Sequence, residues 1–157
     1  MEISYKIGDA TAPEGGGKKI IAHIVNNAGY WGKGFVMAIS KRWPLVKEHY
    51  LEWYDQGEPN FKLGAIQILD VAEDIQIANI VGQHGIRYHH SGVPPIRYEA
   101  LEAGLRLLAF EARKTEASVH MPRIGTGLAG GDWKKIEPII LNTLIGSKVP
   151  VTVYDLS

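Results

Sequence analysis

The sequence predicts an α/β fold, a three-layer α/β/α arrangement with a central mixed sheet. Short apolar runs of strand type alternate along the chain with segments in which apolar residues recur at helical spacing. Two strand-type runs end in glycine clusters that lead into a helix, an order typical of folds that bind ligands beyond the carboxyl ends of their strands. The length of 157 residues suits one domain, expected to span residues 1–157.

Six segments have the composition of strands: 3–7, 20–25, 63–71, 74–81, 118–121 and 151–154. The run 20–25 is almost continuously apolar and rich in β-branched residues, which is typical of a strand buried on both faces. The segment 3–7 alternates apolar and polar residues, which predicts a half-buried strand. A tight turn at Ala72 and Glu73 is expected to join the two middle strands.

Three segments predict helices. Apolar residues step by three and four from Phe35 to Trp43, ahead of Pro44, and again from Tyr98 to Ala112. Asp132 is placed to cap a third helix that ends near Leu144. Because a proline inside a helix removes a backbone hydrogen bond, Pro138 predicts a separate first turn and a regular helix that begins near Glu137.

Composition excludes several classes of function. The 17 basic and 17 acidic side chains cancel, so the chain lacks the broad positive field of a dedicated nucleic-acid binder. There is no cysteine, which excludes disulfides and cysteine-bound zinc and favours a cytoplasmic location. No signal peptide and no apolar run of about 20 residues is found, so no membrane association is expected.

Two glycine-rich loops carry the chemistry, at residues 26–34 and 125–131. Glycines let the backbone turn its N–H groups toward a ligand, and the helix that follows adds a favourable field for an anion. Two such loops side by side could hold a diphosphate. The alternative is that the glycines only form tight turns.

Two common nucleotide-binding motifs do not explain these loops. Gly125, Gly127 and Gly130 satisfy the dinucleotide-binding pattern G-x-G-x-x-G, but only one strand follows them, whereas that fold needs more. The run from Gly32 to Gly34 lacks the spacing and the hydroxyl of a P-loop. Dehydrogenases and simple kinases are therefore disfavoured.

Five segments, in this order, resemble one known family: 7–11 (IGDAT), 23–27 (HIVNN), 31–35 (WGKGF), 121–128 (MPRIGTGL) and 153–154 (VY). The chain resembles a macrodomain over nearly its whole length. It is most similar to the branch that contains terminal ADP-ribose glycohydrolase and the yeast-type ADP-ribose 1″-phosphate phosphatase. That resemblance implies a three-layer fold that binds ADP-ribose without a cofactor.

Carried over by position, the resemblance assigns four groups of ligand-binding residues. The resemblance implies that Asp9, beside Ala10, accepts a hydrogen bond from the adenine amino group and that Tyr154 lies next to the adenine. Along one side of the diphosphate, the resemblance places Trp31, Gly32, Lys33, Gly34 and Phe35 of the first loop. On the opposite side of the diphosphate, it places Gly125, Thr126, Gly127, Leu128 and Ala129 of the second loop. At the distal ribose, it places Asn26, Asn27 and Gln83.

Catalysis departs from the family pattern. The glycohydrolase branch uses a lysine and a loop aspartate, and here those positions hold Gln83 and Ala129. The other hydrolase branch places an aspartate soon after the glycine triplet, but residues 34–37 contain no carboxylate. Neither mechanism is expected in this chain.

The remaining catalytic candidates are His84, Asp132 and Asn27. A histidine oriented by a carboxylate suits general acid–base attack of water on a phosphomonoester or a glycosidic bond. Asp132 can equally be a helix cap, and His84 can equally bond a loop carbonyl. His23 lies in an apolar strand and is expected to be a core histidine with its hydrogen bonds satisfied. The pair His89-His90 lacks a third ligand, so no metal site is expected.

The leading hypothesis is a hydrolase that acts on ADP-ribose 1″-phosphate or on an ADP-ribosyl ester or adduct. The alternative is a non-catalytic ADP-ribose reader, and a weaker third is a processor of ADP-ribosylated nucleic-acid ends. The expected partners are ADP-ribose or its derivatives, including ADP-ribosylated protein or nucleic acid. A competent acid–base pair distinguishes an enzyme from a reader.

Overall fold

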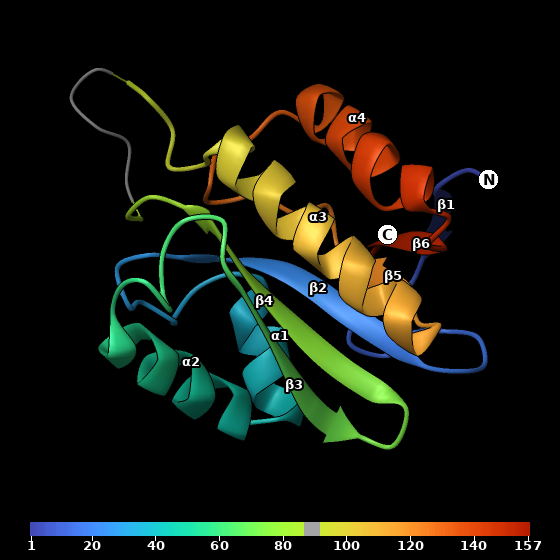
Figure 1. The fold of residues 1–157 in the computed structure, drawn as a ribbon, viewed down its shortest axis with the longest axis horizontal. Coiled ribbons are helices and arrows are strands. Elements are labelled where there is room, and N and C mark those ends of the chain that lie inside the picture. The colour runs from blue at the N-terminus through green and yellow to red at the C-terminus, as the bar shows by residue number, and fades with distance from the viewer. Residues whose placement is uncertain (87–91) are drawn as a thin grey trace.

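The computed structural model describes residues 1–86 and 92–157. A single six-stranded sheet has helices on both faces, as predicted (Figure 1). The elements in chain order are β1 (Ser4–Ile7), β2 (Lys19–Asn26), α1 (Phe35–Arg42), α2 (Leu45–Gln56), β3 (Ile66–Ala72), β4 (Ile75–Gln83), α3 (Tyr98–Thr115), β5 (Ser118–Met121), α4 (Trp133–Thr143), a 3-10 turn (Ile145–Ser147) and β6 (Val151–Asp155).

The sheet is mixed, with the strand order β1-β6-β5-β2-β4-β3. Of the six strands within residues 1–86 and 92–157, β3 alone runs antiparallel, paired with β4 through the predicted hairpin. The other five strands are parallel, so their carboxyl ends lie along one edge of the sheet. The loops at this edge are the predicted glycine-rich loops.

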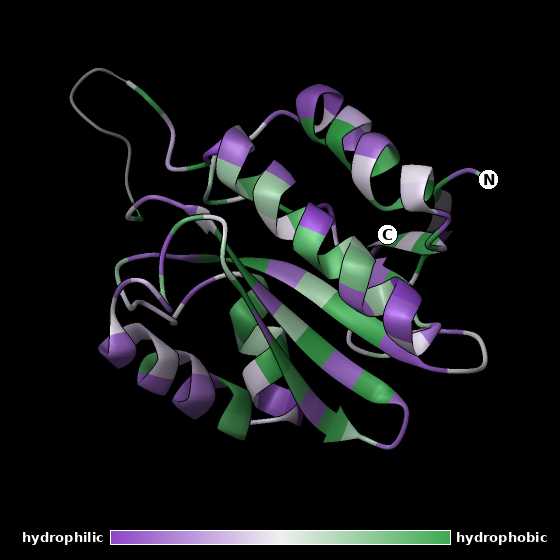
Figure 2. Cartoon of the chain, in the orientation of Figure 1, coloured by the Kyte–Doolittle hydropathy of each residue, from purple (hydrophilic) through white to green (hydrophobic). Residues whose placement is uncertain are grey.

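Each face of the sheet packs against its own helical layer. Alternate residues of β2 point to opposite faces, so Ile21 and Val25 pack with α1 and α2, whereas Ile20 and Ala22 pack with α3 and α4. The helices carry bands of hydrophobic and hydrophilic residues, as an amphipathic helix on a sheet requires (Figure 2). The two cores hold the carboxyl ends of β2, β4 and β5 at fixed spacing.

Two predictions about individual elements were wrong, and one helix was missed. The strand β1 is exposed along its length rather than half-buried, because it is an edge strand. The helix α2 was not predicted, although Val46, Tyr50 and Trp53 give it a buried face. The helix α4 is continuous through Pro138, which lies on its exposed side, where water can bond the carbonyl that loses its partner.

None of the helices within residues 1–86 and 92–157 is long and apolar enough to cross a bilayer.

Candidate functional site

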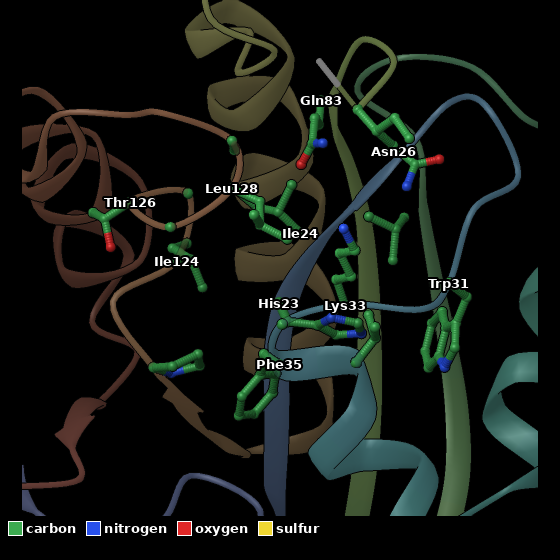
Figure 3. A pocket seen from close by; sticks show the side chains of 18 of the residues that line it. His23, Ile24, Asn26, Trp31, Lys33, Phe35, Gln83, Ile124, Thr126 and Leu128 are labelled. Carbon is green, nitrogen blue, oxygen red and sulfur yellow. The ribbon is translucent and has the colours of Figure 1, made fainter. Parts of the chain in front are cut away.

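A cavity of about 730 Å³ lies at the carboxyl edge of the sheet. Its walls are the end of β2 (residues 23–26), the two glycine loops (30–36 and 122–129), and Gln83 with Ile86 after β4. Figure 3 shows Asn26 and Gln83 at one end of this cavity, with His23 and Phe35 at the other. The volume suits a ligand of nucleotide size.

Most of the predicted binding residues line this cavity, which we call the first cavity: Asn26, Trp31, Gly32, Lys33, Gly34, Phe35, Gln83, Gly125, Thr126, Gly127, Leu128 and Ala129. The structure therefore brings both glycine loops together, as the sequence predicted. Asp9, Ala10, Asn27 and Tyr154 do not line it.

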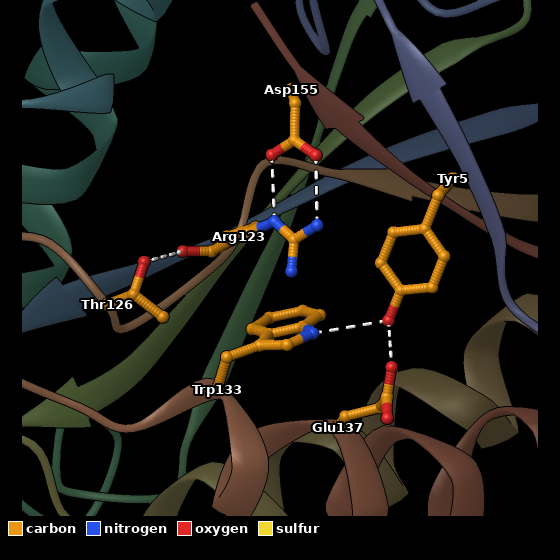
Figure 4. Close-up of polar contacts among 6 residues, drawn as sticks. All are labelled: Tyr5, Arg123, Thr126, Trp133, Glu137 and Asp155. Carbon is orange, nitrogen blue, oxygen red and sulfur yellow. Dashed lines mark hydrogen bonds and ion pairs between the residues drawn. The ribbon is translucent and has the colours of Figure 1, made fainter.

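Of the residues that the structure describes, two cations line the first cavity, Lys33 and Arg123, and no carboxylate does. Arg123 is already paired, since its Nε and a terminal nitrogen donate to Asp155 at 2.8 and 3.0 Å (Figure 4). The rings of Tyr5 and Trp133 lie 5.1 and 5.2 Å from the same guanidinium. This ion pair lowers the pKa of the Asp155 carboxyl.

Lys33 differs from Arg123, because no ion pair of Lys33 occurs among the residues that the structure describes. Its side chain is exposed and borders the first cavity (Figure 3). In a chain with no net charge, Lys33 thus supplies a local positive charge suited to a diphosphate.

The glycines of the two loops are present for different reasons. Gly34 has a φ of 83° directly before α1, a conformation that side chains rarely adopt. At Gly125 a Cβ would lie 2.7 Å from a methyl carbon of Ile96. Gly32 and Gly127 lie outside the left-handed region, and a Cβ there would meet nothing within 4 Å. The fold alone requires the first pair, whereas the second pair leaves open space on the cavity wall.

The side chain of Asn26 builds the first loop. Its Nδ2 donates to the Tyr30 carbonyl at 2.7 Å, and its Oδ1 accepts from the backbone N–H groups of Ala28 and Tyr30. The buried Tyr50 hydroxyl donates to the Asn26 carbonyl at 2.7 Å and contacts its Oδ1 at 3.0 Å. Asn26 thus shapes the cavity wall, and its amide is engaged within the protein.

His23 is buried, as predicted, but it also forms part of the cavity wall. Its Nε2 bonds Oδ1 of Asn79, whereas Nδ1, contrary to the prediction, is buried with no partner among the described residues. The rings of Trp31 and Phe35 pack against the imidazole. Burial lowers the pKa of His23 to about 4, so this wall stays uncharged at neutral pH.

Asp9 is exposed in the turn that follows β1, directly before the buried Ala10 and Thr11. Its Oδ1 accepts hydrogen bonds from the backbone N–H and the hydroxyl of Thr11, at 2.8 and 2.7 Å. These bonds lower the pKa of the Asp9 carboxyl. The carboxylate is therefore held in place by a turn, which accounts for its position with or without a ligand.

Tyr154 is almost wholly buried, and its hydroxyl is part of a buried chain of hydrogen bonds. The hydroxyl accepts from the backbone N–H of Glu14 at 3.0 Å and bonds Nδ1 of His120 at 2.7 Å. The other ring nitrogen of His120 bonds the Ser118 hydroxyl. Burial and two nearby lysines lower the pKa of His120 to about 4. The Tyr154 hydroxyl is thus engaged inside the protein.

The predicted catalytic residues lie in two places. Asn27 Nδ2 donates to Nδ1 of His84 at 2.9 Å, and both residues line a second cavity next to the first. Asp132 caps α4, with its Oδ1 accepting from the backbone N–H of Lys134 at 3.0 Å. Within residues 1–86 and 92–157 no hydrogen bond joins His84 to Asp132, so the structure does not assemble the predicted pair.

Sequence reasoning missed two parts of the site. Arg123 gave no signal of its own, because its ion pair with Asp155 joins residues far apart in the chain. The second cavity depends on α2, which was not predicted. The absence of a metal site was predicted from His89-His90, which lie outside the described residues.

The first cavity, its glycine loops and the strand order agree with one family. A family model described as Macro domain matches residues 22–140, well over half of the chain. The chain belongs to the Macro domain family.

A solved macrodomain from Streptomyces coelicolor is 48% identical to this macrodomain, with a TM-score of 0.87 over 98% of this chain and 99% of that one. An ADP-ribose 1″-phosphate phosphatase from Lodderomyces elongisporus is 26% identical over 89% of this chain and 91% of that protein. This relative agrees with the branch that the sequence predicted.

The Mus musculus chromodomain-helicase-DNA-binding protein 1-like is 31% identical over 97% of this chain. The macrodomain described here spans only 17% of that protein's length.

Proposed function

We propose that this macrodomain binds ADP-ribose in the first cavity. The observation that carries the proposal is a wall that includes Lys33 and two glycines that leave open space, with no carboxylate among its described residues. Such a wall lets a phosphate approach the backbone N–H groups of both loops. Macrodomain membership supports the same ligand.

The order of the strands supports an orientation for the ligand. Along the carboxyl edge, the loop after β1 holds Asp9, the loop after β5 holds Gly125 to Ala129, and the ends of β2 and β4 hold Asn26 and Gln83. We assign the adenine to the β1 end, the diphosphate to the two glycine loops, and the distal ribose to the β2–β4 end. Asp9 and Tyr154 then lie beyond the first cavity on the adenine side.

Hydrolysis of an ADP-ribose derivative is the second candidate function. The phosphatase relative supports it, as does the Asn27–His84 pair beside the proposed distal-ribose end. In that bond Asn27 donates, because its Oδ1 accepts from the backbone N–H of Gly85, so a neutral His84 carries its proton on Nε2. The catalytic roles of Asn27, His84 and Asp132 stay predictions, and the alternative is a reader that binds without turnover.

One experiment separates the enzyme from the reader. The purified protein is incubated with ADP-ribose 1″-phosphate and, separately, with an ADP-ribosylated carrier protein, and released phosphate and free ADP-ribose are measured. If the protein is an enzyme, one of the two products forms faster than it does in buffer without the protein. Tight ADP-ribose binding without release from either substrate identifies a reader.

A further inference from the structure

The second cavity, of about 770 Å³, opens beside the first. It lies between the end of α2, the segment that links α2 to β3, and the loops after β2 and β4. The side chains that matter here are Asn27 and His84 on one side, and Asp55, Glu58 and Lys62 on the other.

A wall one residue thick separates the two cavities. Asn26 and Gln83 are paired across β2 and β4 and line the first cavity, and the next residue of each strand, Asn27 and His84, lines the second. The backbone N–H of Asn27 donates to the Gln83 carbonyl at 3.0 Å, and the Asn27 side chain bonds His84 and the backbone of Gly85. Because only these residues stand between the two cavities, we expect a group attached to a ligand at this end of the first cavity to extend toward the second.

The two cavities differ in charge. Among residues 1–86 and 92–157, Lys33 and Arg123 line the first cavity and no carboxylate does, whereas Asp55, Glu58 and Lys62 line the second. Both acidic side chains belong to exposed residues. The two carboxylates outnumber the one lysine in this described lining, which favours a basic chain over a phosphodiester chain.

We propose that the second cavity holds the polypeptide to which ADP-ribose is attached, and that Asp55 and Glu58 favour basic residues next to the modified side chain. This inference rests on the proposed function, since it places the distal ribose against Asn26 and Gln83. It holds for a reader and for a hydrolase alike, because it concerns the bound polypeptide and not a chemical step.

The test titrates the full chain with four ligands: free ADP-ribose, and one oligonucleotide and two peptides that each carry ADP-ribose at C1″ through a linkage that water does not cleave. One peptide has lysines flanking the modified residue, and the other has glutamates. Titrations follow fluorescence anisotropy or heat. We expect the lysine peptide to bind more tightly than the glutamate peptide by about threefold to tenfold, which is typical of two solvent-facing charge pairs.

The Asp55→Asn, Glu58→Gln double variant is expected to abolish this preference and to leave the affinity for free ADP-ribose within about twofold of the parent. The matched control is Glu73→Gln with Asp74→Asn, which removes the same charge from the β3–β4 turn at the opposite end of β4. Asp74 has a φ of 62°, a conformation that asparagine tolerates. The control keeps the preference for the lysine peptide.

The outcomes separate this inference from the proposed function. If free ADP-ribose binds but the double variant keeps the peptide preference, the second cavity does not hold the polypeptide. The same conclusion follows if an ADP-ribosylated oligonucleotide binds more tightly than the lysine peptide. If neither free ADP-ribose nor either peptide binds, the proposed function fails and this inference fails with it.

Discussion

Replacing Gly127 by alanine separates the role of the loop in binding from its role in folding. A Cβ at Gly127 meets no atom within 4 Å, and the backbone there lies outside the left-handed region. The fold should therefore accept the methyl group, and the stiffer unfolded chain should raise the free energy of unfolding by about 0.4–1 kcal/mol. In the complex the same methyl group occupies space that we assign to the diphosphate.

The cost to binding follows from packing. Forcing a methyl group into filled space costs about 1–3 kcal/mol, which corresponds to a loss of affinity of about 5- to 150-fold. The matched control is Gly125→Ala in the same loop. Gly125 has a φ of 77°, and a Cβ there lies 2.7 Å from Ile96 Cδ1, so this variant should lose about 2–5 kcal/mol of folding stability.

Urea denaturation measures the stability of both variants, and calorimetric titration with ADP-ribose measures the affinity of Gly127→Ala. The reasoning is refuted if Gly127→Ala binds ADP-ribose as tightly as the parent, because the ligand then does not occupy the open space beside Gly127. It is also refuted if Gly127→Ala is destabilised as much as Gly125→Ala.

Three further predictions follow. Asp9→Ala should weaken ADP-ribose binding by about 1–3 kcal/mol, since a charge-assisted hydrogen bond to the adenine amino group is lost; unchanged affinity in a titration would make Asp9 only a turn residue. Asp132→Asn should keep the helix cap, and if Asp132 acts in catalysis, turnover in the product-release assay should fall by about a hundredfold or more; an unchanged rate would leave Asp132 as a cap alone. His23 and His120 have pKa values lowered to about 4, so the unfolded chain binds more protons and stability is lost as pH falls from about 6.5 toward 4. Each of these two histidines should lower the free energy of unfolding by about 2 kcal/mol between about pH 7 and pH 5. A urea midpoint that does not change over this range would contradict the assignment of both as buried neutral groups.

The sheet and most of its neighbours could be predicted from the sequence, because the signals are local. The apolar run of β2 and the glycines that follow it specify a buried strand and a loop without reference to the rest of the chain. The helix α3 is equally clear, since its buried residues repeat at helical spacing over five turns. Local patterns of this kind also located the two loops of the first cavity.

The element α2 shows where local patterns fail. Its polar face is broken by Leu45 and Tyr54, which are exposed, so the contrast between its faces is weak. The buried positions Val46, Tyr50 and Trp53 do have helical spacing, and this signal could have found the helix. The prediction for α4 failed for another reason, because whether Pro138 faces solvent depends on how the helix packs.

The site was predictable in its backbone and not in its side-chain partners. The glycine loops were found because each lies within one short segment. The pairing of Asn27 with His84 joins residues 57 apart, and the pairing of Arg123 with Asp155 joins residues 32 apart. Asp132 had two compatible roles in the sequence, and the structure shows the local one, since a helix cap needs only its own backbone.

The central claim is that the first cavity is an ADP-ribose site, and calorimetric titration of the purified chain tests it most directly. ADP-ribose, ADP and NAD are titrated in turn. ADP-ribose should bind with a Kd on the order of micromolar, ADP more weakly because it lacks the distal ribose, and NAD much more weakly because nicotinamide adds bulk at the wall of Asn26 and Gln83. No heat with ADP-ribose, or equal affinity for all three ligands, would contradict the account.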